Sequence, residues 1–506
     1  MTTEKGEGSN FEAALERTGN GLYNILLVAT CSLILLGIGV DLFGFSLVAV
    51  AACDLDITVT QKGILTSLPF IGILLVSYPW GYISDTKGRR FSLILSVQVA
   101  FVLSCAASLA TNWIFLGLIK FISVCFSCAA NSASYTLVGE SCIQRVRGKY
   151  MLIITCLLIL SPGIAAILSY PTLMLSFNVD IPFLGITFTP WRLLNIVLAI
   201  PAGIGGVAIC FFHESPKFLA SCGRKEEALH VLKSIYSINH GRNKHDIELS
   251  SLVFEAPVVK KHKSLFHAMQ EQSAPLFRIP LLWRTLQLFY IVFVVYITNN
   301  SFLIWLPYVL NLVRSSLETT NEFGNLCQLV SKKDDMPLLT NETIFENATN
   351  SEPICLGYIE ENTIFTLVIS QCIFAFLNFI ISHLMAWRKI VLLTILCLSA
   401  ISGLAVNVMP EPVSAVIFFM AFTGTNLGMG ILASYFVDLY PTSCRGMATC
   451  LSIMVGRTST FIGINVVGNI IFSHCHLTFY FWSFLVFSSM FAAWFLPSDK
   501  MKQLSR

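Results

Sequence analysis

The sequence predicts an all-α integral membrane protein with about twelve membrane-spanning helices. Of its 506 residues, 55% are hydrophobic and only 12% are charged. A soluble protein usually carries roughly 25% charged residues, so this chain has too few to cover a water-facing surface. The mean hydropathy of +0.73 indicates the same environment. A lipid bilayer is therefore the solvent to which the sequence is adapted.

Twelve apolar stretches divide the chain, and each approaches the roughly 20 residues that a helix needs to cross a bilayer. The fifth, eighth and tenth are interrupted by prolines or polar residues, so their boundaries are the least sharply defined. The expected spans are 24–50, 63–83, 91–110, 113–137, 149–170, 192–212, 285–312, 363–386, 390–409, 412–436, 446–470 and 476–496.

Lysine and arginine are concentrated in alternate short loops, which predicts the orientation because basic loops stay in the cytoplasm. The opposite loops are almost free of them, with Lys62 as the exception. Both termini are therefore expected in the cytoplasm. The basic residues of the predicted cytoplasmic loops are Lys87, Arg89, Arg90, Arg145, Arg147, Lys149, Arg388, Lys389 and Arg445.

Two long loops set the domain organisation. One is rich in Lys, Arg and His and separates the first six spans from the last six, and its residues 224–236 have amphipathic helical spacing. The expected parts are a cytoplasmic N-terminal segment (1–23), a six-helix bundle (24–212), a cytoplasmic linker (213–284), a second six-helix bundle (285–496) and a cytoplasmic tail (497–506).

The second long loop, residues 313–362, is predicted to face the lumen or the exterior. It contains two glycosylation sequons, at Asn341 and Asn347, and both fall on the side where glycosylation takes place. Cys327 and Cys355 bracket the sequons, so a disulfide between them is expected, with two free thiols as the alternative.

A compact motif joins the second and third spans, where residues 81–90 read G-Y-I-S-D-T-K-G-R-R. Gly81 would permit close helix approach, and Asp85 would pair with an arginine or cap a neighbouring helix. Gly88 would supply a tight turn, and Arg89 and Arg90 would anchor to the inner leaflet. The motif indicates an inter-helix contact that forms and breaks, and the alternative is an ordinary basic loop.

An acid–base pair recurs at the same place in each half of the chain. Glu140 and Arg147 follow the fourth span, and Asp438 and Arg445 follow the tenth, each with glycine after the arginine. This recurrence is what a parallel duplication of six helices predicts. We call the combined set the cytoplasmic gate: Gly81, Asp85, Gly88, Arg89, Arg90, Glu140, Arg147, Asp438 and Arg445.

The G-x-x-x-D-x-x-G-R-R motif resembles the signature of the major facilitator superfamily. Residues 213–219 (H-E-S-P-K-F-L) resemble an element of its sugar, organic-ion and synaptic vesicle glycoprotein 2 branches. Residues 11–19, 53–55 and 223–241 resemble the synaptic vesicle glycoprotein 2 group most closely. The resemblance implies the twelve-helix fold of that superfamily, in which two six-helix bundles are related by a pseudo-twofold axis and rock around a central cavity.

The chain departs from the family patterns at several positions. His213 stands where proline is usual, and Lys120 stands where many relatives have arginine. The second-half copy of the gate motif, residues 382–389, lacks its acidic residue. The fifth span has Ser161-Pro162-Gly163 without the full glycine pattern of the antiporter signature, so we do not classify the chain as an antiporter.

Three charges are expected inside the membrane, where ionised groups are costly and usually functional. Asp41 and Lys120 lie roughly 15 and 11 Å from the outer ends of their spans, at about 1.5 Å per residue. They are expected to pair across the cavity wall, with two unrelated interior charges as the alternative. Arg457 falls near the midplane and is the strongest candidate for a substrate or gating residue.

Five uncharged polar residues complete the predicted cavity. They lie in the seventh, eighth and tenth spans, and any one of them could instead make a hydrogen bond between helices. They are Tyr296, Asn299, Asn300, Asn378 and Asn426.

The sequence favours a transporter that moves a small organic solute (an organic anion, a zwitterion or a sugar-like molecule), with or without a coupling ion. The alternative is a non-transporting regulator or receptor of a vesicle membrane built on a transporter fold. We see no nucleophile, phosphate-loop or metal-ligand motif, so an enzyme, a cofactor and a metal are not expected. A net charge of +3 does not indicate nucleic acid. We expect a functional monomer in the plasma membrane or an intracellular vesicle membrane.

Overall fold

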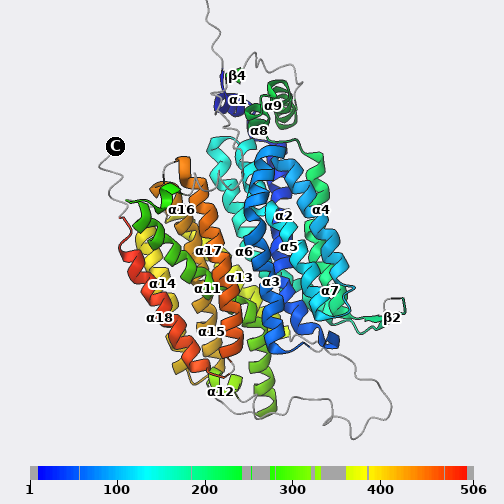
Figure 1. Ribbon diagram of the computed structural model, residues 1–506, viewed down its shortest axis with the longest axis vertical. Helices are drawn as coiled ribbons and strands as arrows, with labels where there is room; N and C mark the ends of the chain where they lie inside the picture. Colours follow the sequence, from blue (N-terminus) through cyan, green and yellow to red (C-terminus); the bar gives the residue numbers. More distant parts are fainter. Residues whose placement is uncertain are drawn as a thin grey trace, which may run out of the picture.

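The computed structural model describes two groups of membrane helices that lie side by side (Figure 1). Twelve helices of the described part are long and apolar enough to cross a membrane, which confirms the predicted number. The described residues are 9–241 except 56 and 184, 252–253, 274–331 except 280 and 321–324, and 361–497 except 385, 386, 441 and 472.

The first bundle consists of six helices joined by short connections. Two of its helices begin with side-chain caps: Thr58 and Gln61 form a reciprocal capping box, and Asn112 accepts a hydrogen bond from the amide of Phe115. Its helices are α2 (Leu22–Ala51), α3 (Val59–Lys87), α4 (Arg89–Ala107), α5 (Trp113–Ser141), α6 (Gln144–Leu173) and α7 (Pro190–Ala208).

The second bundle also provides six spans, but its fourth span is broken. This span lies where the stretch 412–436 was predicted. It is broken by a short 3-10 segment that begins at Gly424 and ends at Gly428. The elements are α11 (Leu281–Thr320), α13 (Glu361–His383), α14 (Arg388–Val408), α15 (Pro412–Thr423), η6 (Gly424–Gly428), α16 (Met429–Leu439), α17 (Thr442–Ile470) and α18 (Cys475–Trp494), with the short α12 (Leu326–Ser331) beside them.

Small residues let the helices approach closely, as is usual where lipid supplies no hydrophobic driving force between helices. A side chain at Gly37 of α2 would collide with the backbone of Ala202 in α7. A side chain at Gly205 would meet Ile34 in the same contact. The α2–α7 contact therefore depends on glycine from both helices.

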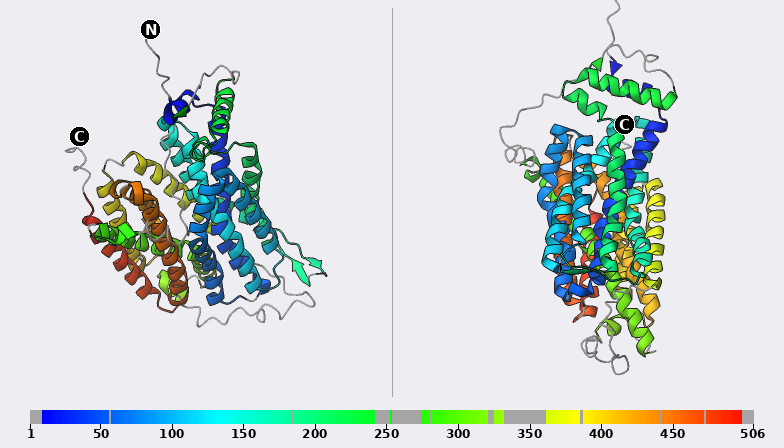
Figure 2. Two further views of the ribbon diagram at one scale, coloured as in Figure 1. Left: turned by 45° about the horizontal axis from the view of Figure 1, so that its top comes forward. Right: turned by 90° about the vertical axis from the view of Figure 1, so that its right-hand side faces the viewer.

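A small extramembrane unit covers one end of the first bundle (Figure 2). Its helix α9 (Lys225–His240) confirms the amphipathic helix predicted at 224–236 and buries Ala228, Val231, Leu232 and Ile235. The unit also contains α1 (Phe11–Arg17), α8 (Pro216–Ser221) and the paired strands β1 (Ser9–Asn10) and β4 (Leu252–Val253).

Asn239 joins this unit to the start of α2. Its amide nitrogen donates to the carbonyls of Thr18 and Gly19, both at 3.2 Å, and its oxygen accepts from the amide of Tyr23 at 3.1 Å. Gly19 has a φ of 68°, a conformation that favours glycine.

We call the end of the bundles that carries this extramembrane unit the inner end, after the predicted orientation. The opposite end, with the hairpin β2 (Val179–Ile181) and β3 (Ile186–Phe188), is the outer end.

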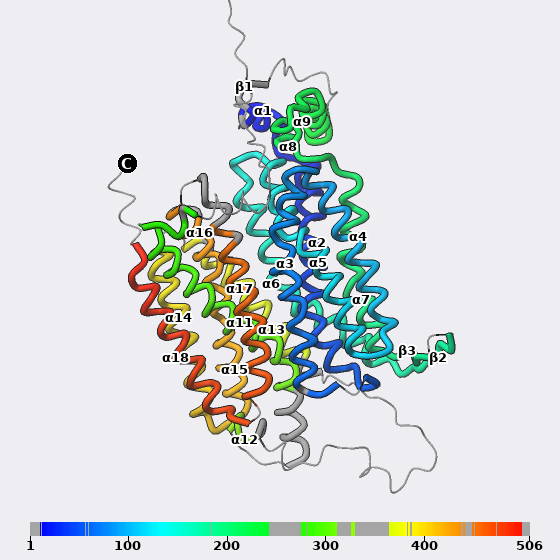
Figure 3. Tube along the Cα trace, viewed as in Figure 1, coloured from blue at the N-terminus to red at the C-terminus, as the bar shows by residue number. Residues whose placement is uncertain are grey.

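The two bundles meet at the outer end through polar contacts between the helices α3 and α17. The paths of these two helices can be followed in Figure 3. The amide of Asn465 donates to Ser67 Oγ at 2.9 Å, and Thr60 Oγ1 lies 3.3 Å from Asn469 Oδ1. Lys62 lies over the ring of Tyr308, with 5.8 Å between its nitrogen and the ring centre. These contacts close the outer side of the space between the bundles.

Candidate functional site

A cavity of about 520 Å³ lies between the two bundles. It is lined by α2, α3, α5 and α6 on one side and by α11, α13, η6, α16 and α17 on the other. It extends to Gly148 and Met151 in the first turns of α6 and to Ile381 near the last turn of α13, which are inner-end positions. Since the outer side is closed by the α3–α17 contacts, the arrangement is inward-facing.

Seven of the eight predicted cavity residues line this space, and their role in binding a solute remains a prediction. Lys120 does not line the cavity because it is buried behind Asp41, with 1% of its surface exposed. The seven that line it are Asp41, Tyr296, Asn299, Asn300, Asn378, Asn426 and Arg457.

Asp41 and Lys120 form the predicted ion pair in the wall of the first bundle. Lys120 Nζ lies 2.5 Å from Asp41 Oδ1, and Ser104 donates to Asp41 Oδ2 at 3.0 Å. Ser104 in turn lies 2.8 Å from the hydroxyl of Ser123, and the ammonium lies 5.1 Å from the ring centre of Phe45. Each charge is thus compensated locally. Ser104 and Ser123 were not predicted, because serine is common in these helices.

Arg457 enters the cavity from α17, opposite the Asp41 wall. Its guanidinium carbon lies 5.6 Å from the ring centre of Phe70 and 5.8 Å from that of Tyr296. Within the described residues, its buried Nε has no hydrogen-bond partner and the guanidinium has no carboxylate within salt-bridge distance. Aromatic faces therefore hold the cation and leave its hydrogen-bond donors for another group.

The two asparagines of α11 form a chain with α17. Asn299 donates to Asn300 at 2.8 Å, and Asn300 donates to Thr460 Oγ1 at 2.9 Å. The chain fixes the orientation of both amides beside Arg457, since Thr460 lies one turn beyond it. The alternative of inter-helix hydrogen bonds therefore holds for Asn300, which both bonds across helices and lines the cavity.

At the inner end, the gate residues of the first half form one charged cluster. Arg89 pairs with Asp85 at 3.0 Å and with Glu140 at 3.2 Å. Ser215, which caps the start of α8, donates to Oε2 of Glu140 at 2.5 Å, the same oxygen that lies 3.2 Å from Arg89 Nε. The ring of Phe218 lies 4.9 Å from the guanidinium carbon of Arg89. In this inward-facing arrangement the cluster lies within the first half and its adjoining α8.

Glu214 holds the turn of the gate motif and was missed by the sequence reasoning. Its carboxylate accepts from the backbone amides of Arg89 at 2.9 Å, Arg90 at 3.0 Å and Phe91 at 3.4 Å. These amides lie in the first turn of α4 and have no acceptor within the helix, and the helix dipole also favours a negative charge there. The only available signal was the position of Glu214 in the element at 213–219.

A family model described as the Major Facilitator Superfamily matches residues 29–326. The chain belongs to this superfamily. The same fold appears in the partially occluded inward open conformation of the xylose transporter XylE from E. coli, with a TM-score of 0.65 and 14% identity over 94% of this chain and 100% of that one.

Sequence relatives support the predicted branch of the superfamily. Synaptic vesicle glycoprotein 2C of Rattus norvegicus is 27% identical over 235 residues, covering 45% of this chain and 32% of the relative. Organic cation/carnitine transporter 7 of Arabidopsis thaliana is 26% identical over 230 residues, covering 45% and 43%. The match thus spans about a third of the length of the synaptic vesicle relative.

The superfamily motif contains one residue whose expected role was wrong. Gly81 was expected to permit close helix approach, but a side chain placed there would meet no atom within 4 Å. The reason is that Gly81 lies on an open face of α3, whereas the adjacent Trp80 makes the contact with α5 and donates to the carbonyl of Cys125 at 2.7 Å. Gly88 does make the expected turn, with a φ of 110°, and a side chain there would collide with Glu214.

The remaining gate residues are only partly described. Arg147 donates to the carbonyl of Cys142 at 3.3 Å. Asp438 and Arg445 belong to α16 and α17, and their side chains lie outside the described residues. The predicted glycosylation sites Asn341 and Asn347 also lie outside them.

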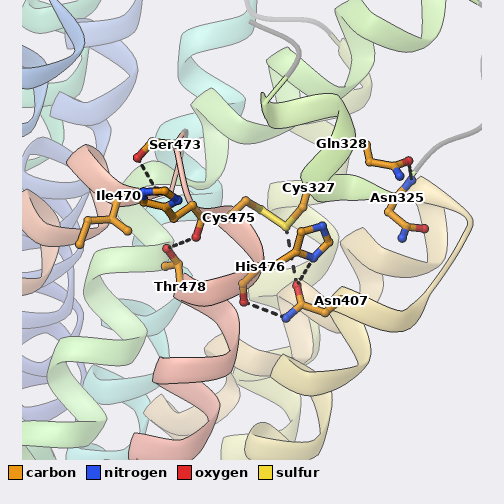
Figure 4. The surroundings of a disulfide bond; sticks show 10 residues. Asn325, Cys327, Gln328, Asn407, Ile470, Ser473, Cys475, His476 and Thr478 are labelled. Carbon is orange, nitrogen blue, oxygen red and sulfur yellow. Dashed lines mark hydrogen bonds between the residues drawn. A yellow bond between two sulfur atoms is a disulfide. The ribbon is translucent and has the colours of Figure 1, made fainter. Parts of the chain in front are cut away.

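The expected disulfide between Cys327 and Cys355 is wrong in its pairing. Cys327 is bonded to Cys475, with 5.4 Å between their Cα atoms (Figure 4). The physical reason is that α12 lies against the start of α18 at the outer end, which brings the two cysteines together across 148 positions of sequence. Cys355 lies outside the described residues.

Asn407 and His476 accompany this disulfide at the outer end. Asn407 Nδ2 donates to the carbonyl of His476 at 3.0 Å, and its Oδ1 lies 3.2 Å from the Nδ1 of the same histidine (Figure 4). The disulfide therefore joins α12 to a point where α14 and α18 are already held together.

Proposed function

We propose that this member of the superfamily carries a small organic anion across its membrane by alternating access. The observation that carries the proposal is the charge balance of the cavity. Asp41 and Arg457 are the charged residues among those that line it. Because Lys120 neutralises Asp41, Arg457 remains as the uncompensated cation of the described lining.

A cation in a site of low dielectric requires a counter-charge or water. A carboxylate is the group that suits a guanidinium, because two parallel N–H donors match its two oxygens. The rings of Tyr296 and Phe70 lie beside the guanidinium, and Arg457 itself lines the cavity. The solute is therefore expected to place its carboxylate against Arg457.

The rest of the lining matches an organic body more closely than an inorganic ion. The volume of about 520 Å³ falls within the roughly 300–1,000 Å³ of small-molecule sites. Apolar residues such as Leu42, Ile73 and Leu303 supply most of the wall, and the amides of Asn378 and Asn426 supply further hydrogen-bonding groups. A carboxylate joined to a largely apolar skeleton with a few polar groups fits this distribution.

Transport would require the two bundles to rock around this cavity. The contacts Asn465–Ser67 and Thr60–Asn469 would break as the outer side opens. The inner ends of α6 and α13 would approach one another, and the Arg89 cluster lies where it can meet the second bundle in that state. The solute would then leave or enter from the opposite side.

The test is a stability and uptake assay on the full chain. Purified protein is heated with organic monocarboxylates, organic amines and neutral sugars, each at matched ionic strength, and the best ligand is then used for uptake into proteoliposomes. A ligand at about a hundred times its Kd raises the stability of the folded state by roughly 2.7 kcal/mol. We expect the carboxylates alone to stabilise the protein.

Two variants of one position make the test specific. Arg457→Gln should remove both stabilisation and uptake, whereas Arg457→Lys should retain weakened binding because the charge remains but the paired donors are lost. Stabilisation by amines or sugars that survives in Arg457→Gln would refute the anion proposal. The absence of stabilisation and uptake across the whole panel would refute transport and favour the non-transporting alternative.

A further inference from the structure

Two adjoining hollows lie at the inner end of the first bundle, away from the central cavity. The first, of about 690 Å³, is a groove bounded by α2, α4 and α7. The second, of about 530 Å³, lies where the α3–α4 turn meets the end of α7, α8 and α9. Phe211 and Phe212 line both, so the two hollows lie on either side of the same two residues.

The groove is apolar and faces outward from the bundle. Ile204 and Val207 in α7 are 56% and 55% exposed, although neither is expected to face water in a membrane helix. The groove runs from Phe211 to Ile200, eleven residues along α7 and the 3-10 turn Ile209–Phe211 that extends it, or roughly 16 Å at about 1.5 Å per residue. This length is close to half of the roughly 30 Å hydrocarbon core, which is the depth of one leaflet.

The second hollow, at the inner end of the groove, carries a net positive charge. Its charged lining residues are Lys87, Arg90, Arg224, Glu214 and Glu227. Glu227 is already paired with Arg224 through two contacts of 2.5 and 2.6 Å, and Glu214 accepts the backbone amides at the start of α4. Lys87 and Arg90 are therefore left without a carboxylate partner among the described residues.

The guanidinium of Arg90 has one hydrogen-bond donor, Nε, without an acceptor among the described residues. Its Nη2 donates to the carbonyl of Cys210 at 2.7 Å, which fixes the side chain against the end of α7. Its buried Nε has no hydrogen-bond partner in the described part of the chain. A buried donor of a charged group is costly to leave unpaired, so an anion beside Arg90 would be stabilised.

We propose that these two hollows bind one inner-leaflet phospholipid with an anionic headgroup. Its phosphate would lie against Lys87 and Arg90, and an acyl chain would follow the groove past Phe211 toward Ile200. A phospholipid has both parts that this site calls for, because its charged headgroup suits the cationic pocket and its acyl chain suits the adjoining apolar groove, which is about one leaflet deep. The cytoplasmic leaflet supplies such lipids, and basic side chains near its surface attract them.

The position of the site gives the lipid a structural consequence. Lys87 and Arg90 belong to the same turn as Asp85 and Arg89, and the pocket also contacts α8 and α9. A bound phosphate would join the α3–α4 turn to the extramembrane unit. The lipid would thus stabilise the half of the gate that lies in the first bundle, independently of any solute in the cavity.

Native mass spectrometry of the full-length purified chain tests the proposal. The protein is exchanged into detergent containing either phosphatidylserine or phosphatidylcholine, and the fraction retaining lipid is measured. We expect phosphatidylserine to be retained preferentially. Lys87→Gln together with Arg90→Gln should weaken this retention by about thirtyfold, since each basic side chain contributes roughly a fivefold preference.

Two further variants separate the groove from the headgroup pocket. Ile204→Trp places a ring in the groove from an exposed position, so it should lower retention of both lipids while leaving the fold intact. Arg145→Gln removes an exposed basic residue of the same inner face that does not line either hollow, and it should leave retention unchanged.

Two results would overturn the proposal. One is equal retention of phosphatidylserine by the wild type, the Lys87/Arg90 variant and Ile204→Trp, each shown to be folded by size-exclusion chromatography and circular dichroism. The other is stabilisation by inorganic phosphate, lost in the Lys87/Arg90 variant, without preferential lipid retention. That second result would assign the pocket to a soluble anion.

Discussion

Lys120 Nζ lies 2.5 Å from Asp41 Oδ1, although the residues are 79 positions apart in the chain. The two ends of this pair have different surroundings. Lys120 belongs to α5 and is 1% exposed, whereas Asp41 borders the central cavity. The pair therefore neutralises the first-bundle wall, and its two members should respond differently when the partner is removed.

Asp41→Asn should destabilise the protein more than Lys120→Met. The first variant leaves an enclosed ammonium without a counter-charge, which costs about 3–5 kcal/mol for a buried pair. The second leaves a carboxylate that water in the cavity can reach, so its cost should be smaller. Unfolding of the purified variants in detergent, followed by intrinsic fluorescence against denaturant, measures the difference.

The double variant Asp41→Asn/Lys120→Met completes this comparison. It removes both charges and should be more stable than Asp41→Asn alone, because no enclosed ion is left unpaired. Glu16→Ala, at an exposed position of α1, is a control expected to change stability by no more than about 0.5 kcal/mol. Strict additivity of the two single changes would show that the pair contributes no coupling.

Glu214→Ala should destabilise the inner end of the first bundle by about 1–2 kcal/mol. The carboxylate accepts the amides of Arg89, Arg90 and Phe91, so alanine would leave the start of α4 without its acceptor and its favourable charge. Hydrogen exchange measured by mass spectrometry should rise at residues 88–92. Glu214→Gln should show a smaller effect, and unchanged exchange in Glu214→Ala would contradict this role.

The spans and the Asp41–Lys120 pair could be predicted because both depend only on counting residues along single helices. Apolar length predicts a span, and a constant rise per residue gives the depth of each charge. The partner of the α4 amides could not be predicted in this way. Glu214 reaches them only because α7 brings the segment after it back to the α3–α4 turn.

In the cavity, too, the residues could be predicted from the sequence but their contacts could not. Arg457, Asn299 and Asn300 could be chosen as polar residues within apolar helices, but their mutual arrangement depends on how α11 packs against α17. The disulfide was predicted incorrectly because proximity in sequence favoured Cys355, whereas the packing of α12 against α18 selects Cys475. Packing between distant segments is the information that periodicity and composition do not contain.

Cys475→Ser should lower the stability of the protein by about 2–4 kcal/mol, because a cross-link over 148 positions restricts the unfolded chain. Non-reducing peptide mapping of the wild type should recover a peptide pair containing Cys327 and Cys475. Cys372→Ser changes an exposed free thiol and serves as the control for loss of a cysteine. A peptide pair containing Cys327 and Cys355 would show that the sequence-based pairing is correct after all.

A cross-link at the outer end should stop transport. Thr60 Oγ1 and Asn469 Oδ1 lie 3.3 Å apart on α3 and α17, so cysteines at both positions should form a disulfide on mild oxidation. Since this contact joins the two bundles, the link would hold the inward-facing arrangement and prevent the outer side from opening. Uptake of the carboxylate identified above should fall on oxidation and return on brief treatment with reductant.

The single variants Thr60→Cys and Asn469→Cys control for oxidation of other thiols, and each should keep its uptake when oxidised. Binding separates a trapped transporter from a damaged one: the cross-linked protein should still be stabilised by the carboxylate, because the cavity extends to the inner end at Gly148 and Ile381. Full uptake by protein shown on a non-reducing gel to be cross-linked would refute rocking of the bundles about this contact, since the outer contact would then not need to break.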